Sequence, residues 1–243
     1  MPYPLRRRRL GRTGGASPLA AQFASAQSQG LTVASNTTLQ VPASGGFSLA
    51  GWFRPTAAGS YRALVGKIQN GVAATDCYGL QIAHPVATDV WELFVVNNGL
   101  FQATDSDGTA PVTLNVRAFV CGTYNRSNGT GLLTINQTSF SANLNAADIN
   151  NGTAPFCIGE RGAGTNYFDG QADSIGFWTR TLTVAETTTL YNNGVPLRRD
   201  QLSGTLLTSL GSYWDYDHGN FNDDVGTNNL TNVNNVVIVR ALS

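Results

Sequence analysis

The sequence predicts an all-β protein: a sandwich of two antiparallel sheets with one short helix near residues 183–193. Only 12% of the 243 residues are charged, whereas Gly, Asn, Thr and Ser are abundant. This composition favours short strands joined by tight turns over amphipathic helices. Apolar runs recur at a spacing of roughly ten residues from Leu19 onward, which is typical of a β-sandwich. A chain of this length can bury the core of one large domain.

Strands in the first half of the chain are marked by alternating side chains and by the turns between them. Phe47, Leu49 and Phe53 share one face of a strand, and Trp52 points to the other. Asn97-Asn98-Gly99 is a hairpin turn. We assign strands to residues 21–23, 30–33, 47–54, 64–68, 78–82 and 91–96.

The second half carries further strands and the helix. We assign strands to residues 118–124, 132–136, 156–159, 172–178, 213–217 and 236–239. Asp169-Gly170 is the turn that enters the strand at 172–178. Thr183 and Glu186 form a capping box, in which each side chain accepts a backbone N–H that the helix leaves unpaired. Asn192-Asn193-Gly194 is a left-handed signal for the end of the helix.

Charge divides the chain into a basic N-terminal arm, residues 1–18, and a body, residues 19–243. The arm holds Arg6, Arg7, Arg8, Arg9 and Arg12, five of the fifteen basic residues, so the remaining chain has ten basic against fifteen acidic groups. An arginine cluster of this kind either is a solvated tail or anchors the chain to nucleic acid or to an acidic protein groove. We expect a protein subunit, and not nucleic acid, as the partner of these arginines.

Targeting signals and cysteine usage indicate where the chain folds. The basic run is followed by Leu10–Gly15 without the apolar stretch of a signal peptide, and no segment has the length of a membrane span. Cys77, Cys121 and Cys157 are odd in number and lie in or beside apolar runs. This pattern predicts buried free thiols and folding in a reducing compartment.

Four segments in this order resemble the laminin-G-like, concanavalin A-like lectin/glucanase superfamily. They are residues 47–55, residues 64–67, residues 119–125, and residues 168–178 with 181–186 after them. The resemblance covers residues 19–195 and implies a jelly-roll sandwich. The last segment is the most specific, because the family places a strand followed by a short helix there.

The order of the segments departs from the family at one point. The family domain usually begins with a strand similar to Leu210–Asp217 and a loop similar to Asn222–Leu230, which here lie near the C-terminus. Residues 205–243 therefore complete the sandwich, either as a circular permutation within the chain or as a segment swapped with a neighbouring subunit. We expect completion within the same chain.

Catalytic patterns are absent from the sequence. Related glucanases carry two carboxylates in a Glu-x-Asp-x-x-Glu strand, and none of Glu92, Glu160 and Glu186 begins that pattern. His84 and His218 read as loop residues, and neither a phosphate-binding loop nor a zinc spacing occurs. We therefore predict that the protein is not an enzyme.

Two kinds of binding site follow from the resemblance. Family members hold a structural Ca²⁺ at the rim of the sandwich, which implies a site at Asp173 with Asp215 and Asp217; alternatively, Asp173 caps a turn. Lectin sites combine an aromatic platform with amide and carboxylate groups. The candidates for carbohydrate binding are Trp91, Tyr78, Tyr61 and Tyr167, each of which can instead belong to the core or the sheet surface.

These observations predict a structural or decoration protein of a virion or similar assembly. In this hypothesis the arginine arm anchors the chain to other subunits, the protein is a homo-oligomer or a capsid or tail component, and the lectin-like sandwich is displayed to bind surface glycans. The alternative is a carbohydrate-binding or adhesin module at a cell surface. A glycoside hydrolase is the third and weakest hypothesis.

Overall fold

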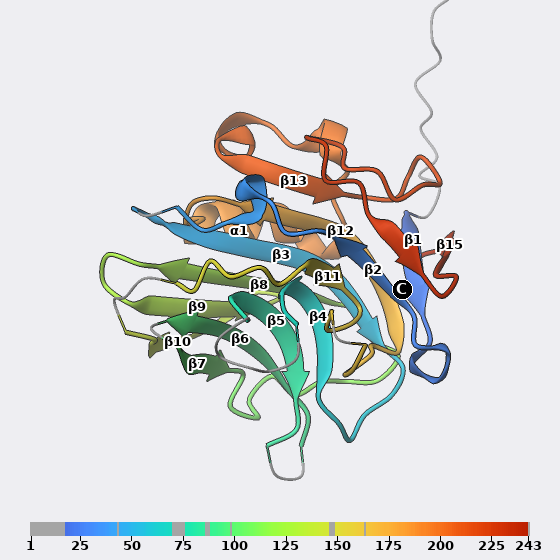
Figure 1. Cartoon of the computed structure of the whole chain (residues 1–243), viewed down its shortest axis with the longest axis horizontal. Helices are drawn as coiled ribbons and strands as arrows, with labels where there is room; N and C mark the ends of the chain where they lie inside the picture. Colours follow the sequence, from blue (N-terminus) through green and yellow to red (C-terminus); the bar gives the residue numbers. More distant parts are fainter. Residues whose placement is uncertain are drawn as a thin grey trace, which may run out of the picture.

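The protein folds into two antiparallel β-sheets packed face to face, as the computed structural model in Figure 1 shows. The structure describes residues 18–42, 44–69, 76–85, 88–97, 99–145, 149–162 and 164–242. The predicted arm, including Arg6, Arg7, Arg8, Arg9 and Arg12, lies outside the described residues apart from Pro18. The predicted all-β sandwich with one short helix is confirmed.

Among the described residues, the first sheet contains eight strands. Its strand order is β10-β9-β8-β3-β12-β1-β15, and β13 also pairs with β12. The bounds are β1 Leu19–Phe23, β3 Gly46–Pro55, β8 Ala118–Asn125, β9 Thr130–Ile135, β10 Thr138–Asn143, β12 Gly170–Trp178, β13 Leu210–Trp214 and β15 Val237–Arg240.

The second sheet contains seven strands in the order β14-β2-β11-β4-β5-β6-β7. The bounds are β2 Gly30–Val33, β4 Arg62–Lys67, β5 Tyr78–Ala83, β6 Val90–Asn97, β7 Leu100–Asp105, β11 Phe156–Ile158 and β14 Thr231–Val233. Strands β7 and β10, at the edges of the two sheets, lie side by side along one flank of the sandwich.

The core fills the space between the sheets with large apolar side chains. Phe47, Leu49 and Phe53 of β3 point into it, as their alternation predicts, whereas Trp52 faces the opposite side. Aromatic rings contact one another across the core: Tyr78 of β5 stacks on Phe177 of β12 with centroids 5.6 Å apart. Burying such rings supplies much of the hydrophobic stabilisation of a sandwich.

A bulge in β12 explains how this strand serves several neighbours. The register against β3 shifts by one residue between Asp173 and Gly176, and Ser174 has a φ of 50°. The extra residue lets Ala172 and Ile175, three positions apart, both face the core. Before the bulge β12 pairs with β1, and after it β12 pairs with β13.

The C-terminal segment adds strands to both sheets of the same chain. Strand β13 pairs with β12, β14 pairs with β2, and β15 pairs with β1. In Figure 1 these strands lie around the N-terminal strands, so residues far apart in the sequence are neighbours in space.

Helix α1, Val184–Tyr191, covers the outer face of the eight-stranded sheet (Figure 1). The predicted capping box is present: Thr183 Oγ1 accepts the N–H of Glu186 at 3.2 Å, and Glu186 Oε2 accepts the N–H of Thr183 at 2.8 Å. Trp52 and Trp178 are buried in a second apolar cluster beneath the helix. Glu186 is therefore a structural residue, as predicted.

Short 3-10 turns connect several strands. They are η1 Ser25–Gln27, η2 Thr37–Leu39, η3 Asn192–Gly194, η4 Arg199–Gln201 and η5 Gly204–Leu207. All three cysteines are buried and outside any disulfide among the described residues, as predicted. Among the described residues, no helix is both long and apolar enough to cross a membrane.

Candidate functional site

The outer face of the seven-stranded sheet carries a row of polar side chains across β5, β6 and β7. Gln81, Glu92 and Asp105 are cross-strand neighbours in register. Gln81 donates its side-chain amide to Glu92. Arg161, which follows β11, donates to the Gln81 side-chain oxygen at 2.8 Å. We call Arg161, Gln81, Glu92 and Asp105 the polar row.

An aromatic platform lies beside the polar row on the same face. Phe101 of β7 stacks on Phe94 of β6, with ring centroids 5.0 Å apart and an interplanar angle of 18°. Phe94 is fully buried, whereas Phe101 is 45% exposed. Both sides of β6 are apolar, because Trp91, Leu93 and Val95 fill the core on its other side. The buried ring therefore holds the exposed ring in a fixed, stacked position on this face.

A groove continues this surface over the flank of the sandwich. Its volume is about 340 Å³, and it is lined by Ala103, Thr104, Asp105, Asp107, Phe140, Ser141 and Ala142. Asp105 belongs both to the groove and to the polar row. The Asp107 N–H is held by Asp105 Oδ1 at 2.8 Å, and Asp107 has a φ of 46°. A ligand on the platform can therefore extend into a recess that contains carboxylates and an aromatic ring.

The charged members of the polar row differ in their electrostatic surroundings. The pKa of Glu92 is raised to about 6, mainly by burial and to a smaller extent by the nearby Asp105 carboxylate, against the opposing effects of Gln81 and Arg161. Arg161 is itself surrounded by the charges of Asp76 and Glu92 and by the Tyr61 hydroxyl. The guanidinium of Arg161 thus donates through Nη2 to Gln81, while its buried Nε has no hydrogen-bond partner among the described residues.

The structure separates the four aromatic residues predicted to bind carbohydrate. Tyr78 and Trp91 are 0% and 1% exposed and pack between the sheets, so in this fold they cannot form an exposed platform. Tyr61 is 43% exposed and lies close to Arg161 at one end of the polar row. Tyr167 is half-buried, and its carbonyl accepts a hydrogen bond from Arg62 at 3.1 Å. Phe101 was not among the candidates.

A second recess lies at the rim, where β13 ends. Its volume is about 410 Å³, and it is lined by Arg198, Arg199, Asp200, Asp215, Asp217, His218 and Asp224. Two of the predicted metal ligands, Asp215 and Asp217, line it. Asp215 accepts the N–H groups of Arg199 and Asp217 at 2.8 and 3.1 Å. Asp217 accepts the N–H of Leu19 at 3.1 Å and lies 2.5 Å from Arg198 Nε.

Asp173, the third predicted ligand, is buried on the outer side of β12. It is 2% exposed, and its Oδ2 has no hydrogen-bond partner among the described residues, while Oδ1 accepts the hydroxyl of Ser174 at 3.1 Å. Burial raises the pKa of Asp173 to about 8, and the charge of Asp217 adds to the shift. Because an orphaned buried carboxylate oxygen is costly, Asp173 fits a bound cation. Asp215 and Asp217, in contrast, already accept N–H donors.

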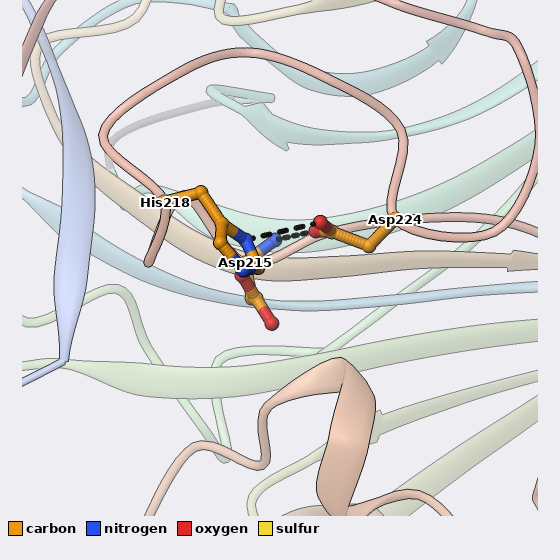
Figure 2. Close-up of side chains that lie close together, drawn as sticks. All are labelled: Asp215, His218 and Asp224. Carbon is orange, nitrogen blue, oxygen red and sulfur yellow. Dashed lines mark hydrogen bonds and ion pairs between the residues drawn. The ribbon is translucent and has the colours of Figure 1, made fainter.

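Two rim residues were not predicted as ligands. Asp215, His218 and Asp224 each place one potential ligand atom within 4.8 Å of the other two. Figure 2 shows the His218 ring facing Asp224, with Nδ1 3.4 Å from Oδ1, and the main-chain N–H of Asp215 facing the same carboxylate. His218 is 73% exposed at its side chain. The sequence did not indicate that His218 and Asp224 would lie close together, because residues 218–229 form an irregular polar loop.

The jelly-roll architecture and its outer sheet face define a lectin-like fold. The chain belongs to the concanavalin A-like lectin/glucanases superfamily, whose family model matches residues 25–188. This confirms the resemblance seen in the sequence. No curated protein sequence matches the chain.

Solved structures share this fold at low sequence identity. A candidate carbohydrate-binding protein from Bacteroides ovatus is 17% identical with a TM-score of 0.66, covering 92% of this chain and 60% of that one. Full-length tailspike protein 2 from a bacteriophage of Escherichia coli O157:H7 is 18% identical with a TM-score of 0.52, covering 84% and 29%. The CBM40 of a Ruminococcus gnavus sialidase, bound to α2,3-sialyllactose, is 15% identical with a TM-score of 0.52, covering 73% and 100%.

The chain therefore spans less than two thirds of the Bacteroides and tailspike proteins. At these identities the likeness establishes the fold, and function has to be argued from the site.

Proposed function

We propose that this protein is a non-catalytic glycan-binding domain, and that the outer face of the seven-stranded sheet is its binding surface. The observation that carries the proposal is the exposed Phe101 ring, fixed on Phe94 beside the polar row. Aromatic faces bind the apolar faces of sugars, and carboxylate groups bind their hydroxyls. Asp105 and Asp107 are the accessible carboxylates, whereas Gln81 is buried and holds Glu92 and Arg161 in place. From Tyr61 beside β4, past the polar row, to Asp105 on β7, the proposed surface crosses three strand spacings, about 14 Å.

The test is a glycan array followed by titration calorimetry with two variants. Phe101→Ala removes the exposed ring and leaves the buried Phe94 in place, so we expect at least tenfold weaker binding with a loss of only about 1 kcal/mol of stability from the ring pair. Val237→Ala is the matched control, because Val237 is 51% exposed on β15, an edge strand of the other sheet. Equal affinity of Phe101→Ala and wild type would refute the placement of the site.

We propose further that the domain is displayed on an assembly such as a virion. The arginine-rich arm, the buried cysteines and the scarcity of charged residues support this reading. The alternative is a carbohydrate-binding or adhesin module at a cell surface. Deletion of residues 1–17 discriminates between them, because it should abolish incorporation into particles while leaving glycan affinity unchanged. Particles that incorporate the truncated chain normally would refute the anchoring role of the arm.

A structural Ca²⁺ at the rim is part of the proposal. Asp173 would hold it through the oxygen that lacks a partner among the described residues, with Asp215 and Asp217 as the neighbouring carboxylates. When bound, the ion would offset the negative charge that gathers at the C-terminal end of β13. Without an ion, Asp173, Asp215 and Asp217 still lie where β12 meets the C-terminal segment.

Glycoside hydrolysis is the second candidate function, favoured by one observation. Glu92 has a pKa raised to about 6 and pairs in register with Asp105, an arrangement in which one carboxyl could act as an acid. Incubation of array-positive oligosaccharides with the protein tests it. Product formation that is lost in Glu92→Gln would establish an enzyme, whereas unchanged oligosaccharides support a binding domain.

A further inference from the structure

The groove between β7 and β10 bears negative charge. Asp105 and Asp107 both line it, and Glu92 neighbours Asp105 across the sheet. In the part of the chain that the structure describes, Arg161 is the cation that the polar row contains; it donates to Gln81, and the negative charges of Asp76 and Glu92 act on it. An acidic ligand entering the groove would therefore meet two carboxylates, and the described residues that line the groove include no arginine or lysine.

From this arrangement we propose that the surface selects uncharged oligosaccharides and discriminates against sialylated or uronic-acid-containing glycans; this inference rests on the proposed function. Hydroxyl groups of a neutral sugar can donate to Asp105, Asp107 and Glu92, which are acceptors when ionised. A ligand carboxylate within about 6 Å of one of these groups loses roughly three- to tenfold in affinity per charge in a hydrated groove. Two such neighbours make the discrimination at least about tenfold.

The fold does not impose this preference. The CBM40 structure with the same fold holds a sialylated ligand, so the charge of the ligand has to be set by the particular side chains on the surface. In this chain the groove-lining residues Phe140 and Ser141 supply an apolar face and a hydroxyl, and the charged residues among the described lining are the two aspartates. Shape and stacking therefore favour the binding of sugars in general, whereas Asp105 and Asp107 determine which ligand charge the surface accepts.

The experiment compares neutral and acidic ligands of matched size, using a neutral galactosyl-lactose trisaccharide with sialyllactose, and hexasaccharides of neutral hexoses with those of uronic acids. The key variant is Asp105→Asn with Asp107→Asn. The amide oxygen that replaces the Asp105 carboxylate can still accept the N–H of residue 107, and asparagine tolerates the positive φ there. Asp200→Asn is the matched control, because it removes one carboxylate from the exposed turn η4 at the distant rim.

We expect wild type and the control to bind the neutral ligands at least about tenfold more tightly, with a gap that narrows at high salt. The double variant should close most of that gap by gaining affinity for the acidic ligands. Acidic ligands that bind wild type equally well or better, through Phe101, would overturn the inference and leave the proposed function standing. Binding that is insensitive to Phe101→Ala, or the absence of any glycan binding, would overturn both.

Discussion

Glu160 provides a quantitative test of the packing around β11. Its side chain is 4% exposed, and its carboxyl carbon lies 2.3 Å from where a Cβ on Gly30 would be. Among the described residues, no cation or hydrogen-bond donor pairs with the carboxylate, and the adjacent Arg161 is directed to Gln81 instead. Burial alone raises the pKa of Glu160 from 4.5 to about 7.

The raised pKa of Glu160 determines how the stability of the fold changes with pH. Below pH 4.5 Glu160 is protonated in both folded and unfolded chains, so it costs nothing. As the pH rises, the unfolded chain releases the proton first, and stability is lost until the folded pKa of about 7 is passed. The full loss is about 3 kcal/mol at pH 8, of which roughly 2.5 kcal/mol develops above pH 5.

The perturbation is Glu160→Gln, measured by urea unfolding at pH 5 and pH 8 in EDTA. Any cost of burying the amide is the same at both pH values and cancels in the difference. We expect the free energy of unfolding of the variant, relative to wild type, to rise by about 2.5 kcal/mol from pH 5 to pH 8. Asp200→Asn controls for the loss of one negative charge at an exposed position. A change below about 0.5 kcal/mol would refute the argument from desolvation.

Three further predictions concern the rim, the helix and a turn. Ca²⁺ at a concentration one hundred times its Kd, in the millimolar range, should raise the thermal unfolding midpoint by about 5 °C relative to EDTA. Asp173→Asn should abolish this rise. Equal midpoints of the wild type in Ca²⁺ and in EDTA would contradict the calcium proposal. Glu186→Ala should lower the free energy of unfolding by about 2 kcal/mol, because it removes a helix cap and a bidentate pair with Arg180; urea unfolding measures this, and a loss below about 0.5 kcal/mol would speak against it. Gly170→Ala should cost at least about 2 kcal/mol in the same assay, since its Cβ would lie 2.2 Å from the Arg54 carbonyl oxygen; wild-type stability would show that the turn can relax.

The sequence allowed the fold to be predicted because its local signals agree with one another. The alternation around Trp52, the capping box at Thr183 and the ten-residue spacing of strands all indicate a sandwich with one short helix. Each of these signals is local, and the structure bears each of them out.

The candidate site could be predicted only in part, because the relevant distinctions are not local. Strand β6 is apolar on both faces, so its pattern could not tell the core side, with Trp91, from the outer side, with Phe94. Phe101 follows the predicted hairpin turn, and the alternation of Phe101, Ala103 and Asp105 was the signal that could have found it. Asp224 joins the rim through a loop without periodicity, where sequence patterns give no register.

The bulge in β12 connects the unusual order of segments to the two candidate surfaces. By ending the pairing with β1 and opening an edge for β13, it brings the C-terminal segment to Asp173, so the rim depends on residues 205–243. The platform and groove, in contrast, are built from β5, β6, β7 and β10, none of which pairs with that segment in the part of the chain that the structure describes. Ion binding at Asp173 should therefore stabilise the fold without changing the affinity of the Phe101 surface for a sugar. The calcium proposal and the glycan-binding proposal can thus be tested separately.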